Sequence, residues 1–253
     1  MKRIRASTVL FLVSLLAAGC ATAQGVPPVE TAQVLPSSTP TARLEPASSP
    51  THVETLTPTP VLFEEGPFVL TIRNGRSFDG QVRGHGATAI ILANMSTGTE
   101  SQWAPLYENL DKDKYTIITY PWLYNAAVID ETEAVLEHLR SAGFERVICM
   151  GASLGARACG WLADQPEIIG LVFIAGPAKH KLEDNDVPKL FIAGKYDQFA
   201  RNTKFDYEHA SEPKEMVLYP THKHGTDLFV SDYGDEFLDL LLTFVDETAT
   251  SAP

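Results

Sequence analysis

The sequence predicts an α/β fold built on a doubly wound, mostly parallel β-sheet. Short apolar runs rich in β-branched residues recur along the chain, for example T-A-I-I-L-A at residues 88–93 and G-L-V-F-I-A at residues 170–175. Continuous runs of this length are typical of strands that are covered on both faces. Amphipathic stretches separate most of them, and strands that alternate with helices favour right-handed crossovers within one sheet.

The composition excludes one broad class of function. The 253 residues are 44% hydrophobic, which is enough for a packed core, and they carry a formal net charge of −12. An acidic chain has no excess of basic side chains to neutralise phosphates, so we do not expect a nucleic-acid partner. The charge does not exclude a neutral small-molecule substrate.

The N-terminus has the layout of an export signal. An apolar run at residues 9–18 is too short to cross a bilayer and follows the basic residues Lys2, Arg3 and Arg5. If this segment is an ordinary secretory signal peptide, we expect cleavage near Ala21 or Ala23.

The end of that run favours a different signal. Its last residues, L-A-A-G-C at positions 16–20, resemble a bacterial lipobox, although Leu16 stands one position earlier than is usual. The resemblance implies a lipoprotein signal peptide over residues 1–19 and lipid attachment at Cys20. The lipid would anchor the protein to a membrane of the bacterial cell envelope, with the folded part facing the periplasm or the exterior.

Residues 20–65 predict a disordered tether between this anchor and the folded part. They are dense in Pro, Ser and Thr, as in L-P-S-S-T-P-T, and show no sustained apolar periodicity. Repeated prolines disfavour both helices and central strands, so we expect an extended linker.

The first half of the folded part begins with a predicted hairpin. Two short strands at residues 68–72 and 78–82 flank the turn signal Asn74-Gly75. Strands follow at residues 88–93 and 115–120, and the second of these is stopped by Pro121. Amphipathic helices are expected at residues 100–110 and 128–142, and Gly143 ends the latter.

The centre of the sequence is the segment R-V-I-C-M-G-A-S-L-G-A-R at residues 146–157. An apolar run at residues 147–150 predicts a buried strand, G-A-S-L-G follows directly, and a helical pattern comes next. Strand, Gly-x-Ser-x-Gly and helix form the context of a nucleophile elbow, in which a strained turn exposes the serine. Ser153 is therefore the candidate nucleophile.

The second half continues the alternation to the C-terminus. Strands are expected at residues 170–175, 189–193 and 215–219. A helix is expected at residues 199–209, and an amphipathic helix at residues 235–245 closes the domain, which we place at residues 66–248.

From residue 68 to residue 245 the chain resembles the α/β-hydrolase family, in its lidless, dienelactone-hydrolase and esterase-like form. The family order is nucleophile, acid, histidine. The acid matches Asp197 in K-L-F-I-A-G-K-Y-D, and the histidine matches His224 in L-Y-P-T-H-K-H-G-T-D. The resemblance implies that Ser153 attacks an acyl group, that His224 is its general base and that Asp197 orients the imidazole.

Each assignment has a competitor in the sequence. Asp197 could instead cap the helix near residue 199, and Asp206 and Asp227 are other carboxylates, although neither follows a strand. His222 lies close to His224, and the following Gly225 favours His224.

Two backbone N–H groups are expected to bind the oxyanion. One belongs to Leu154, which follows the nucleophile, and the other to the loop after residue 93, where Met95 is our choice and Asn94 the alternative. We expect no cofactor and no metal site, because the histidines show no ligand spacing.

The connection at residues 176–188 is too short for an inserted cap domain. We therefore expect an open site, with Trp122, Tyr124, Tyr196 and Phe199 either lining it or serving as core and rim residues.

Cys149 and Cys159 fall on a core strand and the next helix, where we expect free, buried thiols rather than a disulfide.

The function that follows is a membrane-tethered serine hydrolase of small to medium esters, with a small-molecule acyl substrate as its partner. A thioesterase, amidase, peptidase or acyltransferase would use the same triad. A surface-anchored binding protein on a hydrolase scaffold is the alternative from another class.

Overall fold

A computed structural model describes residues 64–96, 99–122, 127–178 and 182–251. The predicted signal peptide, the lipid attachment site Cys20, nearly all of the tether and Tyr124 lie outside these residues. Among the residues described, no helix has the length and apolar character needed to span a membrane.

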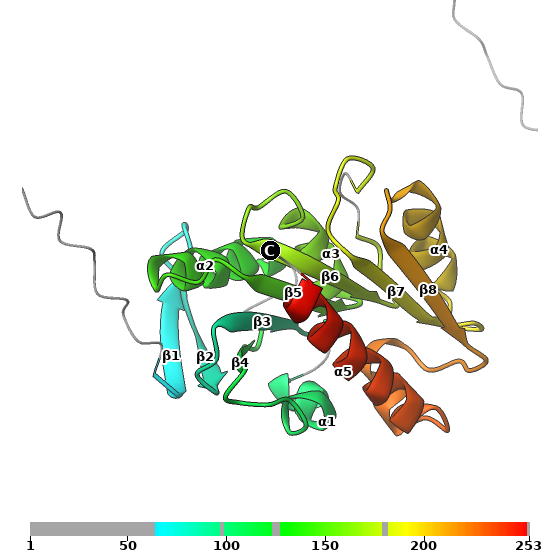
Figure 1. Ribbon diagram of the computed structural model, residues 1–253, viewed down its shortest axis with the longest axis horizontal. Helices are drawn as coiled ribbons and strands as arrows, with labels where there is room; N and C mark the ends of the chain where they lie inside the picture. The colour runs from blue at the N-terminus through cyan, green and yellow to red at the C-terminus, as the bar shows by residue number, and fades with distance from the viewer. Residues whose placement is uncertain (1–63, 97–98, 123–126, 179–181, 252–253) are drawn as a thin grey trace, which may run out of the picture. The chain divides into compact units, whose positions relative to one another are not determined.

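The described residues form one eight-stranded sheet with the order β1-β2-β4-β3-β5-β6-β7-β8 (Figure 1). The first hairpin pairs antiparallel, β2 also pairs antiparallel with β4, and every other neighbouring pair is parallel. The mostly parallel sheet expected from the sequence is confirmed. The strands are β1 Gly66–Thr71, β2 Ser77–Arg83, β3 Thr88–Ala93, β4 Tyr115–Thr119, β5 Val147–Ala152, β6 Ile168–Ile174, β7 Lys189–Gly194 and β8 Lys214–Tyr219.

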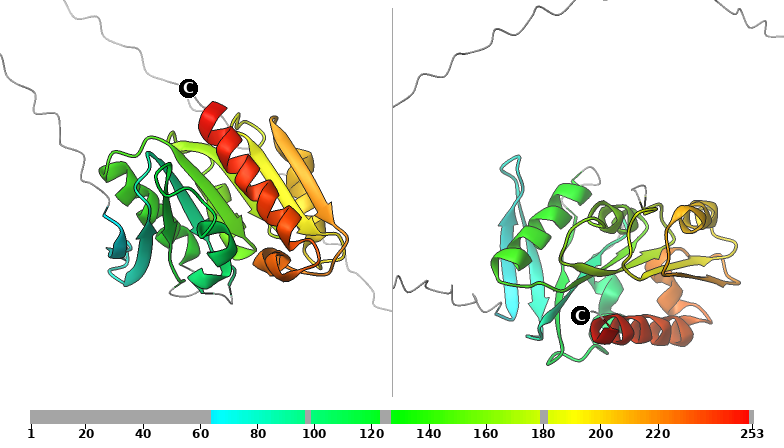
Figure 2. Two further views of the ribbon diagram at one scale, coloured as in Figure 1. Left: turned by 60° about the horizontal axis from the view of Figure 1, so that its bottom comes forward. Right: turned by 45° about the horizontal axis from the view of Figure 1, so that its top comes forward.

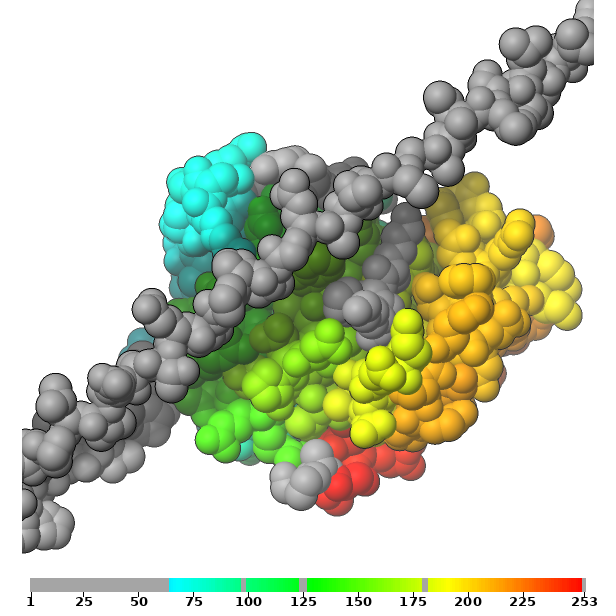
Figure 3. Space-filling view, turned by 90° about the horizontal axis from the view of Figure 1, so that it is seen from above, coloured from blue at the N-terminus to red at the C-terminus, as the bar shows by residue number. Residues whose placement is uncertain are grey.

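Helices cover both faces of this sheet (Figure 2). On one face lie α2, α3 and α4. In the space-filling view, the green middle part of the chain lies between the cyan β1–β2 hairpin and the yellow to orange region that includes α4 (Figure 3). The other face carries α1 and the long α5. The helices are α1 Ala104–Tyr107, α2 Val128–Ser141, α3 Leu154–Trp161, α4 Ala200–His209 and α5 Gly234–Ser251, with 3-10 turns η1 Glu100–Trp103 and η2 Gly225–Val230.

Alternation along the strands divides the core into two layers. In β3, Ile91 packs with α2 and α3 residues such as Leu139, whereas Ile90 and Leu92 pack with α5 residues such as Leu241. Successive side chains of a strand point to opposite faces, so a wholly apolar strand supplies both layers at once.

The parallel register aligns the strand ends along one edge of the sheet. Ala93 of β3 pairs with Gly151 of β5, Ala152 pairs with Ile174 of β6, and Gly194 of β7 pairs with Tyr219 of β8. The loops that leave these strands therefore start side by side, which is where ligands bind in sheets of this kind.

The helical expectations need three adjustments. The helix predicted at residues 100–110 is a 3-10 turn followed by one α-turn, where Pro105 lies at the start. The closing helix runs past residue 245 to Ser251, because Asp246 accepts a hydrogen bond from the Tyr115 hydroxyl and the Ala249 carbonyl accepts one from Arg146. The turn η2 was not predicted.

The prediction of free thiols was wrong, because Cys149 and Cys159 form a disulfide. The elbow folds α3 straight back onto β5 and brings the two Cα atoms to 5.5 Å, a separation that a disulfide spans. Closing a loop with a sequence separation of 10 stabilises the fold by about 3 kcal/mol on loop-entropy grounds.

Substitution of Leu139 tests the packing of the core layer beneath α2. Its side chain is fully buried, so Leu139→Ala removes apolar contacts and leaves a cavity, which lowers the free energy of unfolding by about 3 to 5 kcal/mol. Chemical denaturation measures this change. The matched control is Glu137→Ala on the exposed face of α2, where loss of a surface ion pair with Arg73 costs less than about 1 kcal/mol. Equal losses in the two variants would contradict this packing.

Candidate active site

Ser153 occupies the turn between β5 and α3 in a strained conformation. Its backbone φ is 52° and its ψ is −108°, in a region that residues with a side chain rarely adopt. The turn is held because the Ser153 N–H donates to the Ile174 carbonyl at 2.8 Å. The side chain is partly exposed at the carboxyl edge of the sheet, as a nucleophile elbow requires.

Close backbone contacts explain the small residues around this turn. A methyl group built on Gly151 would overlap the backbone of Gly155 and Ala156, and one built on Gly155 would overlap the Ala93 carbonyl. Gly176 likewise packs against the Ser153 carbonyl. A side chain at any of these positions would therefore push the elbow away from its neighbours.

Asp197 and His224 meet at the same edge, after β7 and β8. The His224 Nδ1 lies 2.8 Å from the Asp197 Oδ2, and the Asp197 side chain is buried. An ionised carboxylate only accepts hydrogen bonds, so His224 Nδ1 carries the proton and Nε2 is free to accept one. This is the arrangement in which a histidine serves as a general base.

The structure also shows the contacts of the residues that competed for these roles in the sequence. The second Asp197 oxygen accepts the Phe199 N–H at 3.2 Å, so the carboxylate braces the turn before α4 and also binds the histidine. Asp206 accepts the Ala178 N–H, a contact that ties α4 to the loop after β6. His222 is exposed, and its Nδ1 lies 3.1 Å from the Tyr196 carbonyl.

Gly225 brings the histidine segment against the elbow. Its φ is +56°, and a methyl group built on it would overlap the Met95 sulfur and lie 3.6 Å from the Ala152 Cβ. The residue after His224 therefore packs on the residue before Ser153. Met95, the predicted oxyanion residue, fills the space next to both.

Asn94 fixes the start of the loop that carries Met95. Its carbonyl accepts the Gly155 N–H at 3.1 Å and the Trp122 indole N–H at 3.0 Å, and its side-chain amide donates to the Tyr120 carbonyl at 2.8 Å. These bonds join the ends of β3 and β4 to α3. Asn94 thus has a structural role through its carbonyl and its side chain, and the oxyanion donors Leu154 and either Met95 or Asn94 stay predictions.

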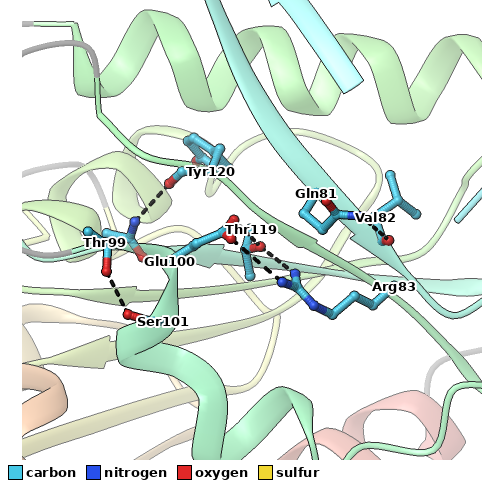
Figure 4. A network of polar contacts seen from close by, with 9 residues as sticks. Gln81, Val82, Arg83, Thr99, Glu100, Ser101, Thr119 and Tyr120 are labelled. Carbon is cyan, nitrogen blue, oxygen red and sulfur yellow. Dashed lines mark hydrogen bonds and ion pairs between the residues drawn. The ribbon is translucent and has the colours of Figure 1, made fainter. Parts of the chain in front are cut away.

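A polar network that the sequence did not reveal holds the other end of this loop (Figure 4). Arg83 of β2 donates to the Thr119 hydroxyl at 2.6 Å, and that hydroxyl donates to the Glu100 carboxylate at 3.0 Å. Arg83 and Glu100 also form an ion pair at 3.7 Å. The three residues lie far apart in the chain, so no spacing in the sequence could have indicated the network.

Aromatic side chains form the rim of the site. Phe199 is 36% exposed and its ring centroid lies 5.0 Å from that of His224, while Tyr196 is 52% exposed and stacks beside His222. Trp122 is half-buried and packs on Tyr120. Thus Tyr196 and Phe199 are rim residues, whereas Trp122 supports the Asn94 loop.

The described part of the chain offers no cap and no metal cluster over this edge. Residues 175–188 connect β6 to β7, and their described portion contains neither helix nor strand. No group of three or more His, Cys, Asp or Glu side chains suited to a metal ion occurs among the described residues.

Gly225 offers a direct test of how the two segments pack. Gly225→Ala forces a side chain into a left-handed conformation and against Met95, so we expect the free energy of unfolding to fall by about 1 to 3 kcal/mol. Adding Met95→Ala removes the overlap and recovers part of the loss, which a double-mutant cycle in denaturant measures. Strictly additive changes would show that the methyl group does not meet Met95.

Comparisons with known proteins agree on the fold alone. No protein-family model and no curated protein matches the sequence. Among solved structures, the esterase Pf2001 of Pyrococcus furiosus is 16% identical, with 73% of this chain and 93% of that chain covered and a TM-score of 0.61. The esterase RhEst1 from Rhodococcus sp. ECU1013 is 15% identical, with 72% and 99% covered and a TM-score of 0.60.

A third similar structure is the esterase domain of a Rhodothermus marinus protein, which is 14% identical, with 73% and 98% covered and a TM-score of 0.60. At identities this low, the TM-scores establish a shared architecture and nothing more. Together with the eight-stranded, mostly parallel sheet covered by helices on both faces, they show that the chain has an α/β-hydrolase fold, with no inserted cap domain among the residues that the structure describes.

Proposed function

We propose that this protein is a membrane-tethered serine hydrolase that cleaves a small to medium ester through Ser153, His224 and Asp197. The observation that carries the proposal is the His224–Asp197 hydrogen bond of 2.8 Å at the sheet edge where Ser153 occupies a strained turn. A buried carboxylate that orients an imidazole, at the sheet edge that also carries a partly exposed serine, is the arrangement used in acyl transfer.

The first half of the reaction acylates the serine. His224 Nε2 accepts the proton of the Ser153 hydroxyl while the oxygen attacks the ester carbonyl, and Asp197 stabilises the imidazolium that forms. The oxyanion of the tetrahedral intermediate accepts hydrogen bonds from the backbone N–H groups of Leu154 and Met95. When the intermediate collapses, the bond to the alcohol breaks and His224 returns the proton to the leaving oxygen.

The second half releases the acid. A water molecule gives a proton to His224 and attacks the acyl carbon. When the intermediate collapses, the bond to the Ser153 oxygen breaks and His224 returns the proton to that oxygen, which leaves the carboxylic acid and the free Ser153 hydroxyl. No redox or metal step is needed to balance this sequence. The strained turn serves both halves because it keeps the serine oxygen at the exposed edge.

We propose an ester as the substrate because of the names of the structural neighbours and because of the aromatic side chains at the rim of the site. Several neighbours are named as esterases, and the two exposed aromatic side chains Tyr196 and Phe199 flank the histidines without a cap domain above them. An open rim admits a substrate of modest size from solvent. The identity of the acyl group does not follow from a triad alone.

The location outside the cytoplasm has two independent supports. The sequence ends its apolar signal run in Gly19-Cys20, and the folded domain contains the Cys149–Cys159 disulfide. Disulfides persist in oxidising compartments and are rare in the bacterial cytoplasm. We therefore propose a lipid anchor at Cys20 with the hydrolase domain in the periplasm or at the cell surface.

The triad is tested by substitution in the full-length protein. Ser153→Ala lowers the turnover of a short-chain ester by a factor on the order of 10³ to 10⁶, because only binding and the oxyanion donors remain. Asp197→Asn costs about 10⁴ by favouring the wrong imidazole tautomer. Labelling with a fluorophosphonate, which reacts with activated serines, reports the nucleophile directly and disappears in Ser153→Ala.

The two neighbouring histidines supply the matched control. His224→Ala falls to nearly the rate of Ser153→Ala, because members of one catalytic unit are strongly non-additive. His222→Ala stays within about tenfold of the wild type, as a change at an exposed rim does. A dead His222→Ala beside a live His224→Ala would reassign the base. A wild-type protein that neither labels nor hydrolyses esters would favour a non-catalytic binding role.

The anchor is tested at Cys20. Cys20→Ser removes the thiol that would carry the lipid, so radiolabelled palmitate no longer enters the protein and the domain leaves the membrane fraction or stalls in processing. Ser153→Ala serves as the control, because it keeps the anchor and stays in the membrane fraction. Palmitate incorporation that is unchanged in Cys20→Ser would rule out lipidation at this residue.

A further inference from the structure

The Cys149–Cys159 disulfide encloses the nucleophile elbow. Cys149 lies in β5 upstream of Ser153, and Cys159 lies in α3 downstream of it, so the bond joins the strand that enters the turn to the helix that leaves it. Both cysteines are fully buried between α3 and the sheet. The strained serine is thus part of a closed covalent ring.

The helix inside this ring has little stability of its own. It has eight residues, two of them glycines, and neither a side-chain cap at Ser153 nor a charged residue that favours its dipole. Glycine weakens a helix, and short helices depend on tertiary contacts. The two glycines, at which a side chain would meet neighbouring backbone, therefore also lower the intrinsic stability of α3.

Two backbone hydrogen bonds fix the turn and the start of α3. The Ser153 N–H is bonded to the Ile174 carbonyl, and the Gly155 N–H is bonded to the Asn94 carbonyl at 3.1 Å. The far half of α3 is held by packing and by the hydrogen bond from the Trp161 indole N–H to the Glu133 carboxylate at 2.7 Å. The disulfide at Cys159 adds a covalent restraint to β5 in that half.

We propose that the disulfide is a positioning element for Ser153, and not merely a stabiliser of the domain; this inference rests on the proposed function. Relaxation of α3 away from β5 would let the left-handed turn open and shift the serine hydroxyl relative to His224. A displacement of about 1 Å at a reacting group costs a large factor in rate. The rim residues Tyr196 and Phe199 lie on another loop, so substrate binding should change little.

The experiment compares the full-length wild type with Cys149→Ala/Cys159→Ala at a temperature where both are folded. We expect kcat for the test ester to fall about tenfold, the rate of fluorophosphonate labelling to fall in parallel and KM to change less than about twofold. Leu139→Ala is the stability-matched control, because it weakens the same core layer near the amino edge of the sheet and should keep the wild-type kcat.

Two further protein preparations test whether a loss of kcat comes from a change in side-chain volume or from a failure to fold. Cys149→Val/Cys159→Ala restores apolar volume on the strand, and wild-type protein refolded with a thiol reductant lacks the bond but keeps every side chain. Both should show the same loss of kcat. Folded protein without the bond but with unchanged kcat would overturn the inference alone. A wild-type protein that neither labels nor turns over the ester would overturn the proposed function, and the inference with it.

Discussion

The close approach of backbone to backbone at the turn between β5 and α3 is the constraint on which the rest of the site depends. The Ser153 N–H reaches the Ile174 carbonyl, and Gly151 and Gly155 leave no room for side chains between the strand and the helix. Hydrogen bonds and packing together offset a backbone strain that would otherwise relax. The serine therefore stays in its strained turn, partly exposed at the carboxyl edge of the sheet.

The same parallel register places Asp197 and His224 at the sheet edge that carries Ser153. Because β3, β5, β6, β7 and β8 end along one edge, loops from distant parts of the sequence start within reach of one another. Asp197 uses one oxygen for the Phe199 N–H and the other for His224, so one carboxylate both braces the turn before α4 and orients the imidazole. The Asn94 loop is held on both sides, by Gly155 at its start and by the Arg83–Thr119–Glu100 network at its end.

The disulfide links this geometry to the compartment in which the protein is proposed to work. Cys149 and Cys159 are fully buried, and in a reducing compartment they would fill the core as two small hydrophobic side chains. In an oxidising one they join β5 to α3 around Ser153. The bond thus adds a covalent restraint to a short helix that contains two glycines.

The sequence by itself determined the order of strands and helices, because continuous apolar runs and amphipathic stretches are local patterns whose periods distinguish the two. It also singled out Ser153, Asp197 and His224, since each follows a strand. Only the tertiary structure decided that Cys149 and Cys159 are joined, that α5 extends to Ser251 on contacts with Tyr115 and Arg146, and that Arg83 reaches Glu100. These features depend on distances between residues far apart in the chain, or on how sharply a turn folds back, and neither is encoded in local periodicity.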